Sequence, residues 1–182
     1  MFSSNYRLNN TFDLYKRGWR GINVDMNSLT IDLFNFCRAG DININCAVSN
    51  KESIKTYYSN GELSPENTLE KNHLLFLNKN FNINNQDFKG KKTKTKTLTN
   101  ILKKNKFYKV DFLNIDLEGH ELKVIKKFNF ALFNIKIICI EVLNHNIKST
   151  KNNKEIQKIL KKNNFTLSKK IGVNYFYKNK NF

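Results

Sequence analysis

The segment that could carry chemistry is FLNIDLEGHELKVIKKF, residues 112–128, in which Asp116, Glu118, His120 and Glu121 follow directly after an apolar run. Carboxylates and a histidine gathered this closely can accept a proton from a hydroxyl group or face a positively charged ligand. Oxygen ligands beside an imidazole could also hold a metal ion, although nothing in the spacing requires one. The ordinary alternative is a turn between a strand and a helix, decorated with capping and surface residues.

Asp116 is one of three acids that each close a short apolar run, and the other two are Asp25 and Glu141. Such runs are typical of buried strands in a parallel sheet, where ligands bind beyond the carboxyl ends of the strands. A single acid at that position usually caps the next helix, but three acids at one rim indicate a binding site. Asp25 closes an early strand, where nucleoside-binding sheets place a carboxylate that accepts hydrogen bonds from both ribose hydroxyls.

The patterns along the chain alternate between strands and helices. Apolar or alternating runs predict strands at residues 21–25, 41–50, 92–97, 110–116 and 135–141, with a final hairpin over 165–177. Apolar residues at helical spacing predict helices at 28–38, 98–105 and 153–163, and another after residue 120 with Leu122, Ile125 and Phe128 on one face. Residues 50–90 predict a loop-rich insertion with one short helix near 67–76. This order predicts one domain over residues 1–182, built as a three-layer α/β sandwich.

Two local expectations are more specific. Ser28 is expected to cap the helix over 28–38, whose apolar face would include Phe36. The alternation of Lys and Thr in KTKTKT, residues 92–97, fits a strand with one polar face, and its row of lysines discourages pairing at a sheet edge.

The composition indicates a folded protein of the cell interior. The chain has 182 residues, of which 40% are hydrophobic, and this is enough to bury a core rather than remain disordered. No apolar run approaches the roughly 20 residues that span a bilayer, and the first residues lack the apolar segment of a signal peptide. Cys37, Cys46 and Cys139 lie far apart in apolar surroundings, which predicts reduced, buried thiols in a cytoplasmic protein.

The net charge of +17 raises a basic nucleic-acid-binding module as an alternative function. The basic residues are 28 Lys and only 4 Arg, they are dispersed, and 31 Asn accompany them. Nucleic-acid readers favour arginine and interleave aromatic residues with the basic ones. Because Lys and Asn have A/T-rich codons, a biased genome produces the same mixture, and we expect a solvated basic surface.

Several segments in combination resemble the FkbM family of S-adenosylmethionine-dependent methyltransferases. They are GWRGINVD, NCAVSN, SPENT, TLTNIL and VDFLNIDLEGHELKVIKKFNF, and the similarity runs from about residue 10 to about residue 167. The resemblance implies a Rossmann-like sandwich of the class I methyltransferase type with a seven-stranded sheet. It also implies S-adenosylmethionine as the cofactor and O-methylation of a small-molecule or glycan hydroxyl.

The resemblance assigns donor-binding roles to the ends of three strands. Asp25 matches the acid that would bind the donor's ribose, and Met26 follows it. Ala47 and Val48, with Ser49, match the strand end against which adenine would pack. Asp116 would lie beside the methyl donor.

Asp116, Glu118 and His120 are the candidate catalytic residues. Methyl transfer needs an oxygen nucleophile held in line with the methyl group in a dry pocket, and a nearby acid or histidine can accept its proton. His120 is the only histidine of the cluster and is therefore the candidate base. Glu121 matches the second acid of the family's EGxE motif and Glu141 the acid that ends the fifth strand, so both would line the rim.

One part of the family pattern is not found in the sequence. Such folds open with a strand and a glycine-rich loop that approaches the donor, whereas no glycine precedes Gly18 here. We therefore expect the first strand to be missing, through truncation or in a degenerate remnant that no longer binds the donor. That strand would separate residues 21–25 from 111–115, so we expect no ladder between these two, and either residues 1–6 or an open slot in its place. The unpaired edges predict a chain that is marginally stable or prone to aggregation.

Overall fold

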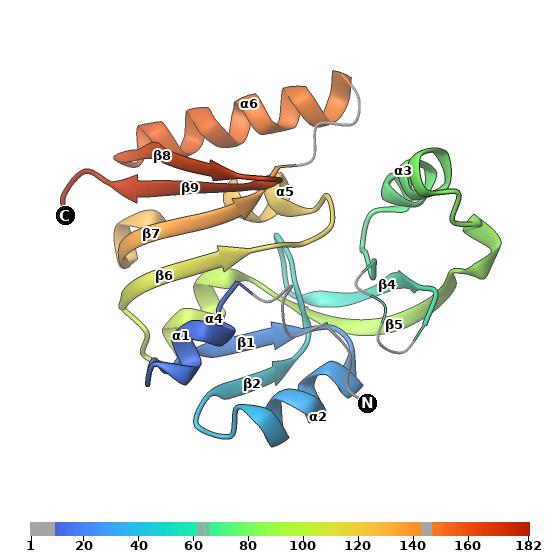
Figure 1. Ribbon diagram of the computed structural model, residues 1–182, viewed down its shortest axis with the longest axis horizontal. Helices are drawn as coiled ribbons and strands as arrows, with labels where there is room; N and C mark the ends of the chain where they lie inside the picture. The colour runs from blue at the N-terminus through green and yellow to red at the C-terminus, as the bar shows by residue number, and fades with distance from the viewer. Residues whose placement is uncertain (1–9, 62–63, 65, 143–146) are drawn as a thin grey trace.

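The computed structural model describes residues 10–61, 64, 66–142 and 147–182 (Figure 1). The strands are β1 (Ile22–Asp25), β2 (Ile42–Asn45), β3 (Ala47–Val48), β4 (Ser53–Ser59), β5 (Lys89–Lys96), β6 (Lys109–Ile115), β7 (Asn134–Glu141), β8 (Phe165–Ile171) and β9 (Asn174–Asn179). The helices are α1 (Phe12–Lys16), α2 (Ser28–Cys37), α3 (Lys71–Phe81), α4 (Leu98–Lys104), α5 (Glu121–Ile125) and α6 (Ile147–Lys162), with short 3-10 turns η2 (Asn85–Asp87) and η3 (Phe130–Leu132). The fold is therefore mixed α/β, as the sequence predicts.

In the part of the chain that the structure describes, the strands form three sheets. The largest has the order β6-β7-β9-β8, with β6 and β7 parallel and β9 antiparallel to both of its neighbours. A second sheet consists of β1 and β2, which are parallel, and a third sheet has the order β3-β5-β4. Figure 1 shows the arrowheads of β1, β2 and β6 pointing the same way, so their carboxyl ends lie on one side of the molecule.

Within the described residues, β1 pairs only with β2, and β6 pairs only with β7. No ladder joins β1 to β6, as expected if a central strand is missing between them. The expectation that residues 1–6 fill this position falls outside the described residues.

One large apolar cluster holds the four-stranded sheet and three helices together. It contains Leu98, Leu102, Leu113, Ile115, Val124, Ile125, Phe128, Phe133, Ile135, Ile138, Ile140, Val142, Ile156, Leu160, Phe165 and Tyr177. Ile156 and Leu160 are one helical turn apart, which is the spacing that turns one face of α6 toward the sheet. Burying each such side chain contributes roughly 1.5–3 kcal/mol, so this cluster fixes the positions of β6, β7 and α5.

The insertion is more regular than its sequence predicts. Residues 50–90 contain β4 and α3, and the helix expected near 67–76 begins and ends about five residues later. β4 forms an antiparallel ladder with β5 from Ser53–Thr95 to Ser59–Lys89. Because this partner lies about 35 residues further along the chain, a local pattern does not reveal the strand.

β5 confirms the predicted strand with one polar face, but the expectation that its lysine row discourages edge pairing is wrong. β5 is the central strand of its sheet, with β3 on one side and β4 on the other. Thr93 and Thr95 are buried on one face, whereas Lys92 and Lys94 lie on the exposed face. Lysines that point to solvent leave the backbone free to pair on both edges.

Three local details also differ from expectation. Asn27, rather than Ser28, is the N-cap of α2, because its side-chain oxygen accepts a hydrogen bond from the backbone N–H of Leu29 at 3.0 Å. Phe36 is 87% exposed instead of facing the core. The strand predicted over 41–50 is interrupted at Cys46, so that β2 pairs with β1 whereas β3 pairs with β5.

All three cysteines are free thiols, as predicted; Cys46 and Cys139 are buried, but Cys37 is only half-buried. In the part of the chain that the structure describes, every helix is too short or too polar to cross a bilayer.

Candidate active site

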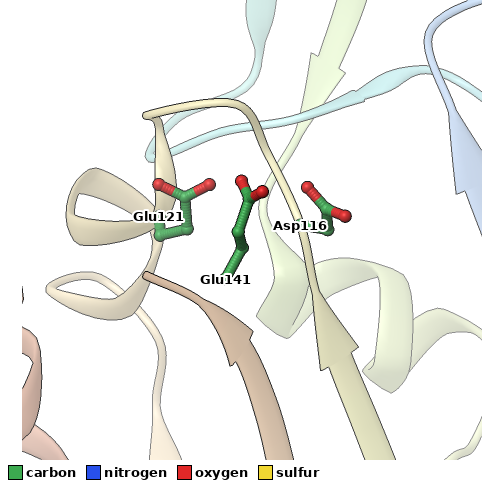
Figure 2. A group of neighbouring side chains, drawn as sticks. All are labelled: Asp116, Glu121 and Glu141. Atoms are coloured by element: carbon green, nitrogen blue, oxygen red, sulfur yellow. The ribbon is translucent and has the colours of Figure 1, made fainter. Parts of the chain in front are cut away.

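Three of the predicted acids meet at the carboxyl ends of β6 and β7 (Figure 2). Asp116 follows β6, Glu141 ends β7 and Glu121 begins α5, and one carboxylate oxygen of each lies within 4.8 Å of the others. β6 and β7 are parallel neighbours with Ile115 opposite Ile140, and this register brings Asp116 and Glu141 to the same edge. Figure 2 shows Glu141 between the other two side chains.

The carboxylates of this acidic cluster titrate abnormally. Burial raises the pKa of Glu121 to about 7, although the side chain accepts hydrogen bonds from the backbone N–H groups of Leu117 and Gly119 at 2.9 and 3.2 Å. Desolvation and then the charge of Asp116 raise the pKa of Glu141. Desolvation and then the charge of Glu118 raise the pKa of Asp116. The side chain of Asp116 is nevertheless the exposed member of the cluster. The pKa of Glu141 is raised further than that of Asp116.

Asp25 ends β1 and is not a member of the acidic cluster. One of its carboxylate oxygens accepts a hydrogen bond from the backbone N–H of Asn27 at 2.7 Å, and the other accepts none from the described residues. Burial raises the pKa of Asp25 to about 6, and the Asp25 charge contributes to a raised pKa of Tyr57 after burial. Asn27, rather than Asp25, is the N-cap of α2, so the second carboxylate oxygen of Asp25 has no part in capping this helix.

The other predicted donor-binding residues lie at strand ends as expected from the sequence. Met26 is half-buried in the bend between β1 and α2. Ala47 and Val48 form β3; Ala47 is 2% exposed, and Val48 packs against the large apolar cluster.

Glu118 and His120 do not join the acidic cluster but turn toward the insertion. Oε2 of Glu118 lies 3.0 Å from Nε2 of His73, and the backbone carbonyl of Glu118 accepts a hydrogen bond from Thr68 at 2.9 Å. Nδ1 of His120 lies 2.5 Å from Oε1 of Glu70. The turn that carries them has positive φ angles at Glu118 (49°) and Gly119 (91°), and the second of these requires glycine's freedom.

Both ring nitrogens of His120 are engaged. Nε2 lies 3.0 Å from Oγ of Ser49, which in turn accepts a hydrogen bond from Nζ of Lys55 at 2.8 Å. One arrangement satisfies every group: Lys55 donates to Ser49, Ser49 donates to His120, and His120 donates to Glu70. The order Ser–His–Glu resembles that of a hydrolase triad, but Ser49 and His120 are 1% and 2% exposed, so no substrate reaches the hydroxyl.

Sequence reasoning missed the contributions of Glu70, His73 and Lys55. They lie in a stretch whose pattern is weak, and no spacing connects them to residues 116–121. Burial opposes the ionisation of Glu70, but the bonds from His120 and Lys123 outweigh it and lower the pKa of Glu70 to about 2. Glu70 is therefore a charged partner at neutral pH.

Two clefts lie away from the acidic cluster. The larger, of about 720 Å³, is lined by Ile42, Ile44, Glu52, Lys96, Asn100, Ile101, Lys103, Lys104, Asn105, Lys106 and Tyr108. The smaller, of about 340 Å³, is lined by Asn27, Ser28, Leu29, Asp32, Tyr57 and Lys91 and adjoins the end of β1. Neither is lined by Asp116, Glu121 or Glu141.

Comparison with known proteins gives one match. The family model of the methyltransferase FkbM domain matches residues 4–167. No curated protein and no solved structure matches the chain significantly.

Proposed function

Because the chain belongs to the FkbM methyltransferase domain family, we propose that it transfers a methyl group from S-adenosylmethionine to a hydroxyl of a small molecule or glycan. The observation that carries this proposal is the meeting of Asp116, Glu121 and Glu141 at the carboxyl ends of parallel strands. Sheets of this kind bind their ligands at that edge.

We propose that the two-stranded sheet β1-β2 and the four-stranded sheet β6-β7-β9-β8 are two parts of one Rossmann-like, three-layer sandwich. Their parallel strands, the antiparallel β9 and the packing of α4, α5 and α6 on the large apolar cluster support this assignment. The first strand would lie between β1 and β6, where the described residues supply no ladder.

The residues present fit S-adenosylmethionine at two places. The second carboxylate oxygen of Asp25 can accept hydrogen bonds from the ribose hydroxyls, and the half-buried Met26 and Val48 can pack against the adenine, with the buried Ala47 behind them. Among the described residues, Oε2 of Glu141 is buried without a hydrogen-bond partner, which suits a hydrogen-bonding group of a ligand at the acidic cluster. When bound, the donor supplies a methyl group on a positively charged sulfur.

We propose that the pair Asp116–Glu141 receives the proton of the acceptor hydroxyl. Its raised pKa values place proton exchange closer to neutral pH than for ordinary carboxyls. Glu118 and His120, predicted from the sequence as catalytic, are engaged by His73, Glu70 and Ser49. We therefore assign these two residues to the support of the turn rather than to contact with the acceptor.

Calorimetry with S-adenosylmethionine and with its demethylated product tests the proposal directly. Saturable binding at a single site is the expected result. A folded chain without affinity for either compound would contradict the proposal and support the degenerate remnant. We place the activity in the reducing cytoplasm, which the three free thiols support.

A further inference from the structure

The loop that carries the acids is held by the insertion through two crossed pairs. We define the acidic loop as residues 116–121 and the latch segment as residues 68–73. The acidic loop offers Glu118 and His120, and the latch segment offers His73 and Glu70 in return. Each segment thus contributes one glutamate and one histidine to the contact.

The acidic loop has a conformation that its sequence does not favour on its own. Glu118 has a φ of 49°, a left-handed conformation that non-glycine residues adopt rarely, and it precedes Gly119 at 91°. Such conformations persist where the surroundings over-determine them. The latch segment supplies that surrounding, because the hydroxyl of Thr68 donates to the carbonyl of Glu118 while His73 contacts its carboxylate.

The latch segment is itself anchored. Thr68 is fully buried and exchanges two backbone hydrogen bonds with Tyr58 of β4, at 2.9 and 3.1 Å. Its hydroxyl also accepts a hydrogen bond from the backbone N–H of Glu70 at 2.9 Å. The insertion therefore presents Glu70 and His73 on a support that is fixed to the sheet.

The far side of the acidic loop is fixed as well. Oγ of Ser49 contacts Nε2 of His120, and the carboxylate of Glu121 accepts hydrogen bonds from the backbone N–H groups of Leu117 and Gly119. The acidic loop is clamped between the end of β3 and the latch segment, and its two ends place Asp116 and Glu121 opposite Glu141.

We infer that Glu70 and His73 are positioning residues for the acidic cluster: they contact His120 and Glu118 of the acidic loop. The part of this inference that concerns activity rests on the proposed function. The part that concerns the conformation of the acidic loop does not, and the two can be measured separately.

The variants E70Q and H73Q remove the crossed pairs. E155Q is a matched control, because Glu155 pairs with Lys126 at 2.7 Å and both residues lie outside the acidic loop and the latch segment. Hydrogen exchange is the first readout. In E70Q and H73Q we expect the amides of Leu117 and Gly119 to exchange about ten-fold faster, while that of Ile138 in β7 is unchanged. Exchange at the parent rate in both variants would overturn the inference, and so would equal acceleration at Ile138, which would indicate general loosening.

Affinity for the demethylated donor is the second readout, measured where urea titration shows the variants to be folded. A loss of about ten-fold in E70Q and H73Q, with E155Q like the parent, is the expected result. Parent affinity in a variant whose acidic loop exchanges faster would overturn the positioning role. If the parent chain binds no donor, the proposed function fails, and the exchange result alone decides the inference.

Discussion

Oγ of Ser49 lies 3.0 Å from Nε2 of His120, although 71 residues separate them in the sequence. The contact joins the end of β3 to the turn before α5 and leaves the imidazole without a free nitrogen. A residue that the sequence presents as a candidate base is therefore part of a buried hydrogen-bond chain.

Ser49→Ala should destabilise the fold by about 1–3 kcal/mol, because it leaves His120 and Lys55 without a shared partner. The free energy of unfolding in urea is the measurement. Asn100→Ala removes an exposed hydrogen bond to Glu52 and serves as the control, with an expected change below about 0.5 kcal/mol. Equal effects of the two substitutions would show that the buried chain adds nothing.

Asp25→Ala should weaken binding of S-adenosylmethionine by about 1–3 kcal/mol, because a charged acceptor for the ribose hydroxyls is lost. Calorimetry measures the change. Asp111→Ala removes an exposed carboxylate that pairs with Lys136 at 2.7 Å and should leave the affinity unchanged. Affinity like that of the parent in the Asp25 variant would remove this residue from the donor site.

Glu141→Gln should reduce methyl transfer more than donor binding, because glutamine cannot take part in the proton exchange of the pair with Asp116. The comparison is between turnover and the dissociation constant of the demethylated donor, once an acceptor is in hand. A variant with unchanged turnover would assign the proton transfer to another group.

Glu121→Gln should stabilise the protein at alkaline pH. The pKa of Glu121 is raised to about 7, so the folded state binds a proton that the unfolded state has released, and stability falls as pH rises between about 4.5 and 7. Glutamine stays neutral and can still accept the two backbone hydrogen bonds. We expect the difference in unfolding free energy between variant and parent to grow by about 1–3 kcal/mol from pH 4.5 to pH 8. A difference that does not vary with pH would contradict the raised pKa.

The lysines test the nucleic-acid alternative. Lys96, Lys103, Lys104 and Lys106 line the larger cleft. If the basic surface is merely solvated, replacing these four by Gln should weaken retention of single-stranded DNA no more than replacing the exposed Lys151, Lys154, Lys158 and Lys161. A loss about ten-fold larger for the cleft set would favour a nucleic-acid site.

Among the described residues, the edges of β1 and β6 that face away from β2 and β7 pair with no strand, and on this ground we expect the 182-residue chain to have low stability. Each unmet buried backbone group costs about 1–3 kcal/mol, against a total stability of about 5–15 kcal/mol. Thermal unfolding followed by circular dichroism, together with the concentration dependence of aggregation, measures this. Cooperative unfolding of a soluble monomer at high temperature would contradict the prediction.

The sequence was sufficient to predict the strands β6 and β7, the helices α2 and α4, the final hairpin and the acids at the strand ends. These features depend on residues that are neighbours along the chain, whose alternation or helical spacing is visible without a partner. The meeting of Asp116 with Glu141 also follows, once two parallel strands are assumed to be adjacent.

The tertiary structure was needed to show which side chains hold the turn before α5 and which remain available to a ligand. Glu70 and His120 are 50 residues apart, and β4 acquires its regular form from a ladder with β5. The burial of His120 and the raised pKa of Glu121 come from atoms supplied by distant segments, because desolvation depends on everything that surrounds a group. A local pattern contains no information about that surrounding, so the residue types were predictable and their roles were not.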